Sequence, residues 1–304
     1  MDDPRTASPS PSRPVTTGMR PDDAVRSILS DCVAQIAVHA AVLKAGRSVD
    51  GLHRLRVALR RLDVALQMFA RTFRQPELEA LRRPGKDLSG RMGPARDLDV
   101  FVETLLDAAP RGAGGGRAAL RRRAEAARED AWKAVDACVR GEDFARFLHD
   151  VAVLAATGLP TGRDPRLPRI AAHILDRQLK RVTKRGRAAK GDAGPDEAAL
   201  HRLRIALKKL RYAAEFFAPL YPARKVKAYL KQVRALQEHL GDLNDIANVR
   251  RTLALVLPGD EKERDGGARL AAGRLEDWYG AHAGDRARQA LRCYAQFRTV
   301  RPFW

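Results

Sequence analysis

Two segments of the chain place a histidine and several basic residues at helical spacing. HRLRVALRRL spans residues 53–62, and HRLRIALKKL follows exactly 148 residues later, at 201–210. At about 100° per residue, the basic residues gather on one side of each helix and the leucines on the opposite side. Guanidinium and ammonium groups in such a row suit phosphate and other anions, and histidine adds a proton-dependent donor. The candidate anion-binding residues are His53, Arg56, Arg60, His201, Arg204, Lys208 and Arg211.

These two basic faces lack the acidic residues that usually alternate with cations on a solvated helix. The first acid to follow is Asp63 in one segment and Glu215 in the other. Like charges three and four positions apart repel by a few tenths of a kcal/mol, so an external anion is expected to supply the negative charge. A solvated basic surface without a ligand is the alternative.

Further basic residues recur at helical spacing elsewhere. One face of the predicted helix 168–189 carries five of them, with Asp176 as the only acid in the stretch, and the opening helix of the chain has no equivalent. The second half is therefore expected to hold more of the ligand. A third helix, ending near Gly241, carries three basic residues, and two of these have basic counterparts that flank Pro84-Gly85, where proline is expected to bend the helix. The additional candidates are His173, Arg177, Lys180, Arg181, Lys184, Lys227, Lys231, Arg234, Arg83 and Lys86.

The 148-residue offset persists beyond these segments without a gap. Phe69 matches Phe217, and Asp97 matches Asp245. Such a repeat predicts two copies of one supersecondary unit that face each other. The predicted organisation is a disordered tail (1–19), a first helical repeat (20–157), a linker (158–167) and a second helical repeat (168–304).

The periodicity of apolar residues predicts an all-α chain. Apolar positions recur at i, i+3, i+4 and i+7, with Gly and Pro between segments and no sustained alternation. The predicted helices are 20–45, 51–74, 77–91, 95–108, 116–140 and 142–157, then 168–189, 196–218, 223–240, 242–257, 266–280 and 284–299. Glycine-rich stretches at 112–116, 191–194 and 259–267 are expected to be exposed loops.

A repeated glycine–aspartate segment follows each histidine helix. GPARDLDV begins at Gly93 and GDLNDIAN at Gly241. The glycines are predicted to end a helix in the left-handed conformation, which places Asp97 and Asp245 in the first turn of the next helix. The carboxylates of Asp97, Asp99 and Asp245 could bind a metal or act as structural partners for arginine, and the second interpretation needs no further ligands.

The composition limits the classes of possible binding partner but does not identify one. The chain has a net charge of +20 and a pI near 10.7, and 45% of its residues are hydrophobic. Such a chain folds and attracts nucleic acid, anionic lipid or polyphosphate. Three widely spaced cysteines indicate buried thiols in a reducing compartment. No apolar run approaches membrane-spanning length and no signal peptide is evident, so a cytoplasmic protein without membrane contact or cofactor is expected.

The chain resembles the conserved histidine α-helical domain (CHAD) family. The resemblance rests on the two HxxR[VI]AxxxL helices, the segments GPARDLDV and GDLNDIAN, and the closing RPFW. It implies two four-helix-bundle-like repeats related by a pseudo-two-fold axis around a basic cleft or pore that binds inorganic polyphosphate, at polyphosphate granules in bacteria. The two halves differ at two matched positions. The first half has Asp63 where the second has Arg211, and it has Ala95-Arg96 where the second has Leu243-Asn244.

The leading hypothesis is therefore a non-enzymatic polyphosphate-binding protein. A nucleic-acid-associated protein is the alternative, but single-strand binders stack bases on aromatic side chains, and Tyr212 is the nearest aromatic to these faces. Weak, non-specific nucleic-acid binding at low salt is expected in either case. A phosphohydrolase using His53 or His201 is disfavoured because the basic faces contain no carboxylate cluster or phosphate-binding loop. An α-helical scaffold whose charge only confers solubility is the remaining possibility.

Overall fold

The computed structural model describes residues 14–108, 116–157, 166–190, 196–257 and 266–304. All regular secondary structure in these ranges is helical. The prediction of an all-α chain is confirmed. The predicted loops at 191–194 and most of those at 112–116 and 259–267 lie outside the described residues, as does most of the predicted linker.

Helices of the two halves follow one another in a similar order. The first half contains α1 (Pro21–Ala45), α2 (Val49–Phe73), α3 (Pro76–Ala80), α4 (Arg82–Arg91), α5 (Gly93–Val100), a π-helical turn (Phe101–Leu105), α6 (Leu106–Ala108), α7 (Gly116–Arg140) and α8 (Glu142–Thr157). The second half contains α9 (Leu167–Ala188), α10 (Glu197–Phe217), a 3-10 turn (Ala218–Leu220), α11 (Ala223–Val256) and α12 (Gly266–Phe297).

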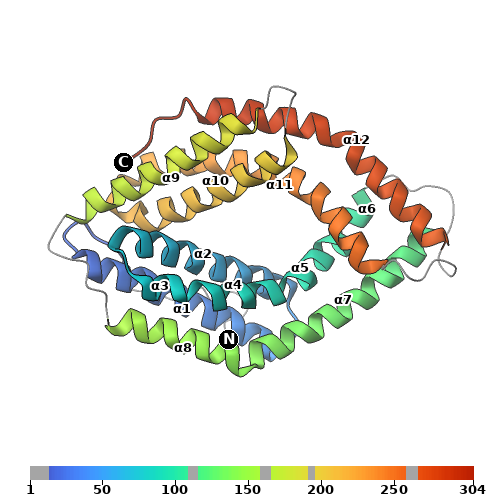
Figure 1. Cartoon of the computed structure of the whole chain (residues 1–304), viewed down its shortest axis with the longest axis horizontal. Helices are drawn as coiled ribbons and strands as arrows, with labels where there is room; N and C mark the ends of the chain where they lie inside the picture. The colour runs from blue at the N-terminus through green and yellow to red at the C-terminus, as the bar shows by residue number, and fades with distance from the viewer. Residues whose placement is uncertain (1–13, 109–115, 158–165, 191–195, 258–265) are drawn as a thin grey trace.

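The helices form an elongated assembly with α2 and α10 at its middle (Figure 1). In that view α1, α3, α4 and α8 lie on one side of this pair, and α9 and much of α12 lie on the other. At one end, α7 of the first half packs against α11 and α12 of the second half. Contacts between the halves therefore occur both at the centre and at this end.

Short polar residues begin the two histidine helices. The Ser48 hydroxyl caps α2 by accepting a hydrogen bond from the Gly51 amide at 3.0 Å, and the Asp196 carboxylate caps α10 by accepting from the Ala198 amide at 2.9 Å. Each bond satisfies one of the amides that a helix leaves free at its start. Both helices then bury their leucine-rich side, which fixes the direction of the basic side.

The predicted helix end at Gly241 is wrong. Gly241 lies inside the continuous helix α11, so the predicted helices 223–240 and 242–257 are one element. Predicted helices 266–280 and 284–299 are likewise joined in α12. Neither Gly241 nor Gly93 adopts a left-handed backbone conformation. A glycine inside a helix costs only about 1 kcal/mol, which burial of the apolar side of a long helix can outweigh.

Proline divides the corresponding stretch of the first half. α3 ends at Ala80 and α4 begins at Arg82, just before Pro84. Proline lacks the amide that would bond to the carbonyl four residues earlier and collides with that carbonyl. The predicted bend at Pro84 is therefore present as a break between two short helices. The predicted helix 95–108 is also divided, because residues Phe101–Leu105 form a π-helical turn.

The repeated aspartates do not occupy first turns as predicted. Asp97 lies in the second half of α5, and Asp245 lies inside α11. The third aspartate, Asp99, is fully buried, and its carboxylate accepts hydrogen bonds from Arg128 Nε at 2.7 Å and Trp132 Nε1 at 3.0 Å. The interpretation of these carboxylates as structural partners for arginine fits Asp99.

Helix α1 is long and apolar enough, by length and composition alone, to cross a membrane. The expectation that no apolar stretch comes near that limit needs this correction. In the fold, α1 packs against α2 and α8 and buries residues such as Leu29 and Ile36, as a core helix does. Of the predicted tail, residues 1–13 lie outside the described ranges, whereas Val15 is described and buried.

Candidate functional site

The basic sides of α2 and α10 meet at the centre of the molecule. The opposite sides of these helices are buried through Leu55, Leu62, Leu203 and Leu210, and the two helices are in contact. Five of the predicted basic residues then influence one another electrostatically across the two halves. We call them the facing cluster: Arg56 and Arg60 from α2, with Arg204, Lys208 and Arg211 from α10.

Lys208 lies at the centre of the facing cluster. Burial lowers the pKa of its ammonium group most, and the positive charges of Arg60, Arg204, Arg211 and Arg56 lower it further, to about 7. The usual value for lysine is about 10.4. An ammonium group with so low a pKa has too little negative charge near it. Burial and the neighbouring cations therefore make a positive charge on Lys208 unfavourable in the protein alone.

One arginine follows each histidine by three residues, and the two arginines have different hydrogen-bond partners. Arg56 donates from Nη1 to the Ser89 carbonyl at 2.6 Å, and burial together with Arg60 lowers its pKa to about 10. Arg204 donates from Nη1 to Asn244 Oδ1 at 2.7 Å. The first half has Arg96 where the second has Asn244, and an arginine cannot accept that bond. The sequence difference at this position thus produces a different anchor in each half.

Both histidines are neutral at neutral pH. Burial lowers the pKa of His53 most, followed by the charges of Arg96 and Arg60. Burial and the charges of Arg204 and Lys208 lower the pKa of His201. Each histidine therefore offers a neutral donor near pH 7, and protonation of either is opposed by the cations of the site unless an anion is bound.

Polar contacts beside the facing cluster join the halves. Arg61 of α2 donates to Glu215 of α10 at 2.8 Å, and Lys209 of α10 donates to Gln67 of α2 at 2.7 Å. Glu215 also lies 3.6 Å from Arg211. Glu215, the first acid after the second basic face, is therefore already paired with Arg61 and Arg211. Arg61 and Lys209 were not among the predicted site residues, because each lies at the edge of the basic face of its helix.

Two further arginines influence the site, Arg96 from the first glycine–aspartate segment and Arg251 from α11 just after the second. Arg96 lowers the pKa of His53, and Arg251 lowers the pKa values of His201 and Arg56. Arg251 also donates to Asp97 at 2.8 Å, which bridges α11 and α5 across the halves. Arg96 was detectable in the sequence because it interrupts the repeat, whereas no sequence pattern marked Arg251.

The basic residues predicted on one face of α9 lie in two different places. Arg177 donates to the Thr72 hydroxyl at 2.9 Å, and Arg71 lowers the pKa values of both Arg177 and Arg181, after burial. These arginines therefore lie beside the end of α2. Lys180 and Lys184 instead line a groove of about 650 Å³ together with Asp176, Thr183 and Arg187.

The remaining candidates are exposed, and the structure records no interaction between them and the facing cluster. They are His173 on α9, Arg83 and Lys86 on α4, and Lys227, Lys231 and Arg234 on α11. Lys231 and Arg234 occupy the positions that match Arg83 and Lys86. The structure thus gathers the histidine-helix candidates most closely and leaves these others as surface cations.

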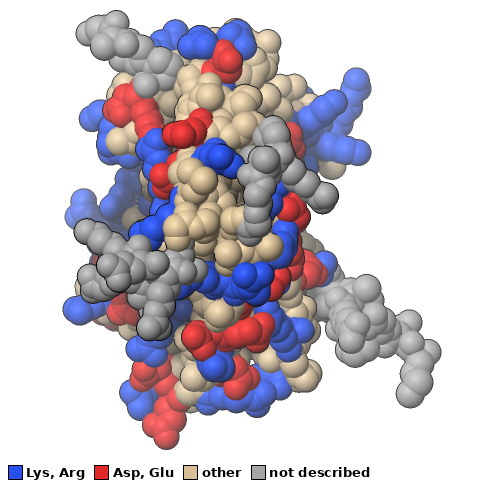
Figure 2. All heavy atoms as spheres, turned by 90° about the vertical axis from the view of Figure 1, so that its right-hand side faces the viewer, with Lys and Arg blue, Asp and Glu red and all other residues tan. Residues whose placement is uncertain are grey.

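Basic residues do not cover the molecule evenly. Figure 2 shows the end of the molecule at the right of Figure 1, where Lys and Arg alternate with Asp and Glu around a strip of other residues. The ion pair Arg121–Asp107 joins the first half of α7 to α6. The charge of this end is therefore largely balanced, in contrast to the facing cluster.

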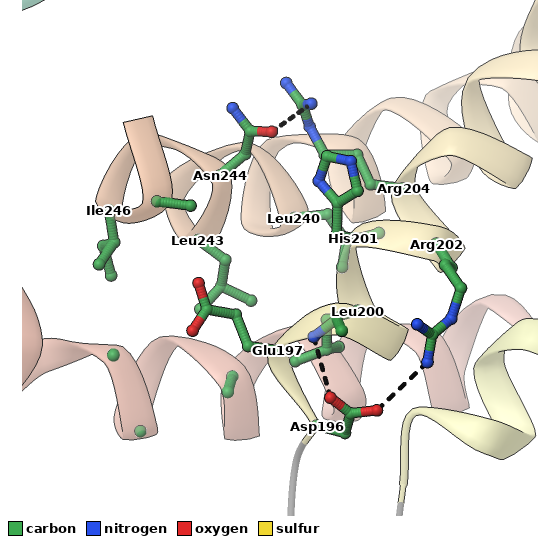
Figure 3. A pocket seen from close by; sticks show the side chains of 15 residues that line it. Asp196, Glu197, Leu200, His201, Arg202, Arg204, Leu240, Leu243, Asn244 and Ile246 are labelled. Atoms are coloured by element: carbon green, nitrogen blue, oxygen red, sulfur yellow. Dashed lines mark hydrogen bonds and ion pairs between the residues drawn. The ribbon is translucent and has the colours of Figure 1, made fainter. Parts of the chain in front are cut away.

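An apolar pocket adjoins the facing cluster in the second half. Its volume is about 710 Å³, and it lies between the start of α10, the middle of α11 and α12. Leu200, Leu240 and Leu243 form much of its wall, and His201 and Arg204 lie at one end, where Asn244 holds Arg204 (Figure 3). This pocket was not predicted from the sequence, because its walls are apolar residues of the kind that usually form a core.

Comparison with known proteins identifies the fold family. The CHAD domain model matches residues 27–254. The crystal structure of the CHAD domain from the plant Ricinus communis is 26% identical, with a TM-score of 0.80, and the match covers 95% of this chain and 96% of that one. PptA from Streptomyces chartreusis is 20% identical, with a TM-score of 0.70 and coverage of 90% and 99%. No curated protein matches the chain significantly. The match to the family model, together with the two histidine helices that meet at the centre of the fold, shows that the chain belongs to the CHAD domain family.

Proposed function

We propose that this protein binds inorganic polyphosphate at the facing cluster and does not catalyse a reaction on it. In this proposal the halves are tandem repeats related by a pseudo-two-fold axis, and the basic cleft runs between their histidine helices. The matching order of α1–α2 and α9–α10, and the contact of α2 with α10, support this arrangement. The protein would act in the cytoplasm at polyphosphate granules.

The observation that carries the proposal is the surrounding of Lys208. Burial, followed by the charges of four arginines from two helices, lowers the pKa of this one lysine to about 7. Bringing these cations together costs free energy, which a bound polyanion would recover. A single phosphate could meet only some of them. A flexible chain of phosphates can place successive charges along both helices, with bidentate contacts to the arginines.

Arg177 and Arg181 supply further guanidinium groups on α9, in the second half. They lie beside Arg71 at the end of α2. A ligand that occupies the facing cluster and continues past these residues would meet further guanidinium groups. This arrangement favours a long polyanion over orthophosphate, because each added phosphate contributes another modest contact.

Nucleic acid is the second candidate ligand, and the described geometry favours it less. Tyr212, the aromatic residue nearest the basic faces, is buried at 1% exposure, so it offers no stacking surface for a base. Its ring instead lies under Arg211, 4.9 Å from the guanidinium carbon. We expect nucleic acid to bind weakly, through its phosphates alone.

A binding role is also better supported than phosphoryl transfer. No group of three or more His, Cys, Asp or Glu residues with metal-binding geometry occurs in the described ranges. Asp97 and Asp99 there are engaged by Arg251 and Arg128, respectively. Carboxylates that are paired with arginines are poorly suited to bind the metal ions that phosphoryl transfer commonly uses.

Competition binding tests the ligand class. Labelled long-chain polyphosphate should be displaced by unlabelled polyphosphate at much lower phosphate concentration than by RNA, duplex DNA or orthophosphate, at about 150 mM salt, where non-specific phosphate contacts are weak. Preference for RNA or DNA would replace the proposal with a nucleic-acid-binding role. The same mixtures, incubated with divalent metal ions, should show an unchanged chain-length distribution on a gel. Shortening abolished by His201→Ala would indicate an enzyme.

A further inference from the structure

The apolar pocket of the second half exists because α12 carries small residues there. Ala283, Gly284 and Ala287 line it. The positions 148 residues earlier, on α7, carry Val135, Asp136 and Val139, and both valines are buried in the core at 1% exposure. One turn before them, Trp132 is buried in the first half, whereas Gly280 stands at the matching position. In the first half, Trp132, Val135 and Asp136 border only a smaller pocket, of about 270 Å³.

Polar groups stand at opposite ends of this pocket (Figure 3). Arg204, Asn244 and His201 lie at one end, and Glu197 and Asp196 at the other. Arg204 belongs to the facing cluster, so the pocket and the cluster share a guanidinium group. Asp196 is engaged by the Ala198 amide and by Arg202 at 3.3 Å. The pocket can therefore take a molecule with an anionic end, an apolar body and a hydrogen-bond donor at its far end.

We infer that this pocket binds the organic group of a nucleoside polyphosphate, with the phosphates of that ligand on Arg204 and the facing cluster. The inference rests on the proposed function, because the cluster must hold the phosphates. A volume of about 710 Å³ suits a group of nucleoside size, since ligand pockets span about 300–1,000 Å³. The leucine walls give a flat base an apolar surface, and Glu197 can accept from an exocyclic amine. Inorganic polyphosphate has no part that would use these walls.

Calorimetric titration of the wild-type protein with three ligands tests the inference. Adenosine triphosphate should bind about tenfold more tightly than inorganic tripolyphosphate in metal-free buffer, because the base buries apolar surface that the inorganic chain lacks. Inosine triphosphate, which has no exocyclic amine, should fall between them. Equal affinities for all three would overturn the inference. Tighter binding of tripolyphosphate than of both nucleotides would also overturn it.

A pair of substitutions that copies the first half locates the effect. Ala283→Val with Ala287→Val fills the pocket with the residue type found at the matching positions. The tenfold advantage of adenosine triphosphate should disappear, while affinities for tripolyphosphate and long-chain polyphosphate stay unchanged. Ala281→Val, at an exposed position of the same helix outside the pocket lining, should leave all affinities unchanged.

The outcomes separate the inference from the proposed function. An advantage that survives the valine pair would overturn the pocket assignment and leave polyphosphate binding in place. Failure of the wild-type protein to bind even long-chain polyphosphate would overturn the proposed function. Thermal melting checks that the valine pair folds. If it does not, Ala283→Val alone is used with the same expected direction.

Discussion

Reversing charge at Arg204 and Lys208 together should weaken polyphosphate binding by roughly 1,000-fold, since each of the two lost half-buried charge contacts costs on the order of 2 kcal/mol. The double variant Arg204→Glu with Lys208→Glu removes the centre of the facing cluster and places two carboxylates among Arg56, Arg60 and Arg211. Equilibrium binding of labelled long-chain polyphosphate measures the effect.

The matching reversal in the first half should have a smaller effect. Arg56→Glu with Arg60→Glu changes the charge equally, but leaves Lys208, Arg177 and Arg181 in the second half intact. Equal losses from the two double variants would contradict the predicted asymmetry. Arg122→Glu with Arg146→Glu, at exposed positions of α7 and α8, gives the same change in net charge away from the cluster and should cost little. Thermal melting of all three variants separates lost contacts from unfolding.

Raising the pH from about 7 to 9 should weaken polyphosphate binding by up to tenfold per pH unit, because one proton is taken up on binding. In the free protein the pKa of Lys208 is about 7, so the group is neutral above this value. Phosphates bound beside it restore a pKa near the ordinary value of about 10.4. Below pH 7, Lys208 is protonated in both states and contributes no pH dependence. The guanidinium group of Arg56, with a pKa of about 10, stays charged over this range.

Lys208→Arg is the control for this pH dependence. An arginine at position 208 keeps its charge to high pH, so the affinity of this variant should be nearly constant between pH 7 and 9. The pKa values of His53 and His201 are lowered in the free protein, and a bound anion opposes that shift, so Lys208→Arg also reveals any proton that a histidine takes up on binding. A wild-type affinity that does not change with pH would show that Lys208 does not meet the ligand. A pH dependence that persists in Lys208→Arg would assign the proton to another group.

Local patterns predicted the histidine helices well because their two faces differ so sharply. Leucines three and four positions apart fixed the buried side of α2 and α10, and the basic residues had to lie opposite. The break before Pro84 was also predictable, since proline removes a specific hydrogen bond. In contrast, nothing local revealed that Gly241 would sit inside a helix. Whether a glycine ends a helix depends on the packing of the residues on both sides of it.

Features that depend on contact between the halves could not be read from one segment. The pairing of Arg61 with Glu215 joins residues 154 positions apart, and Arg251 reaches Asp97 over the same separation. The apolar pocket was equally hidden. It arises from what α12 lacks relative to α7, and small residues on a helix carry no signal of their own until the packing around them is known.

The salt dependence of polyphosphate affinity tests the central claim most directly. If several cations of the facing cluster each contact a phosphate, log affinity should fall linearly and steeply as log salt rises. Replacement of one cluster residue, such as Arg60→Gln, should reduce the slope by roughly one contact's share. A slope near zero, or a slope that Arg60→Gln, Arg204→Gln and Lys208→Gln all leave unchanged, would contradict binding at the facing cluster.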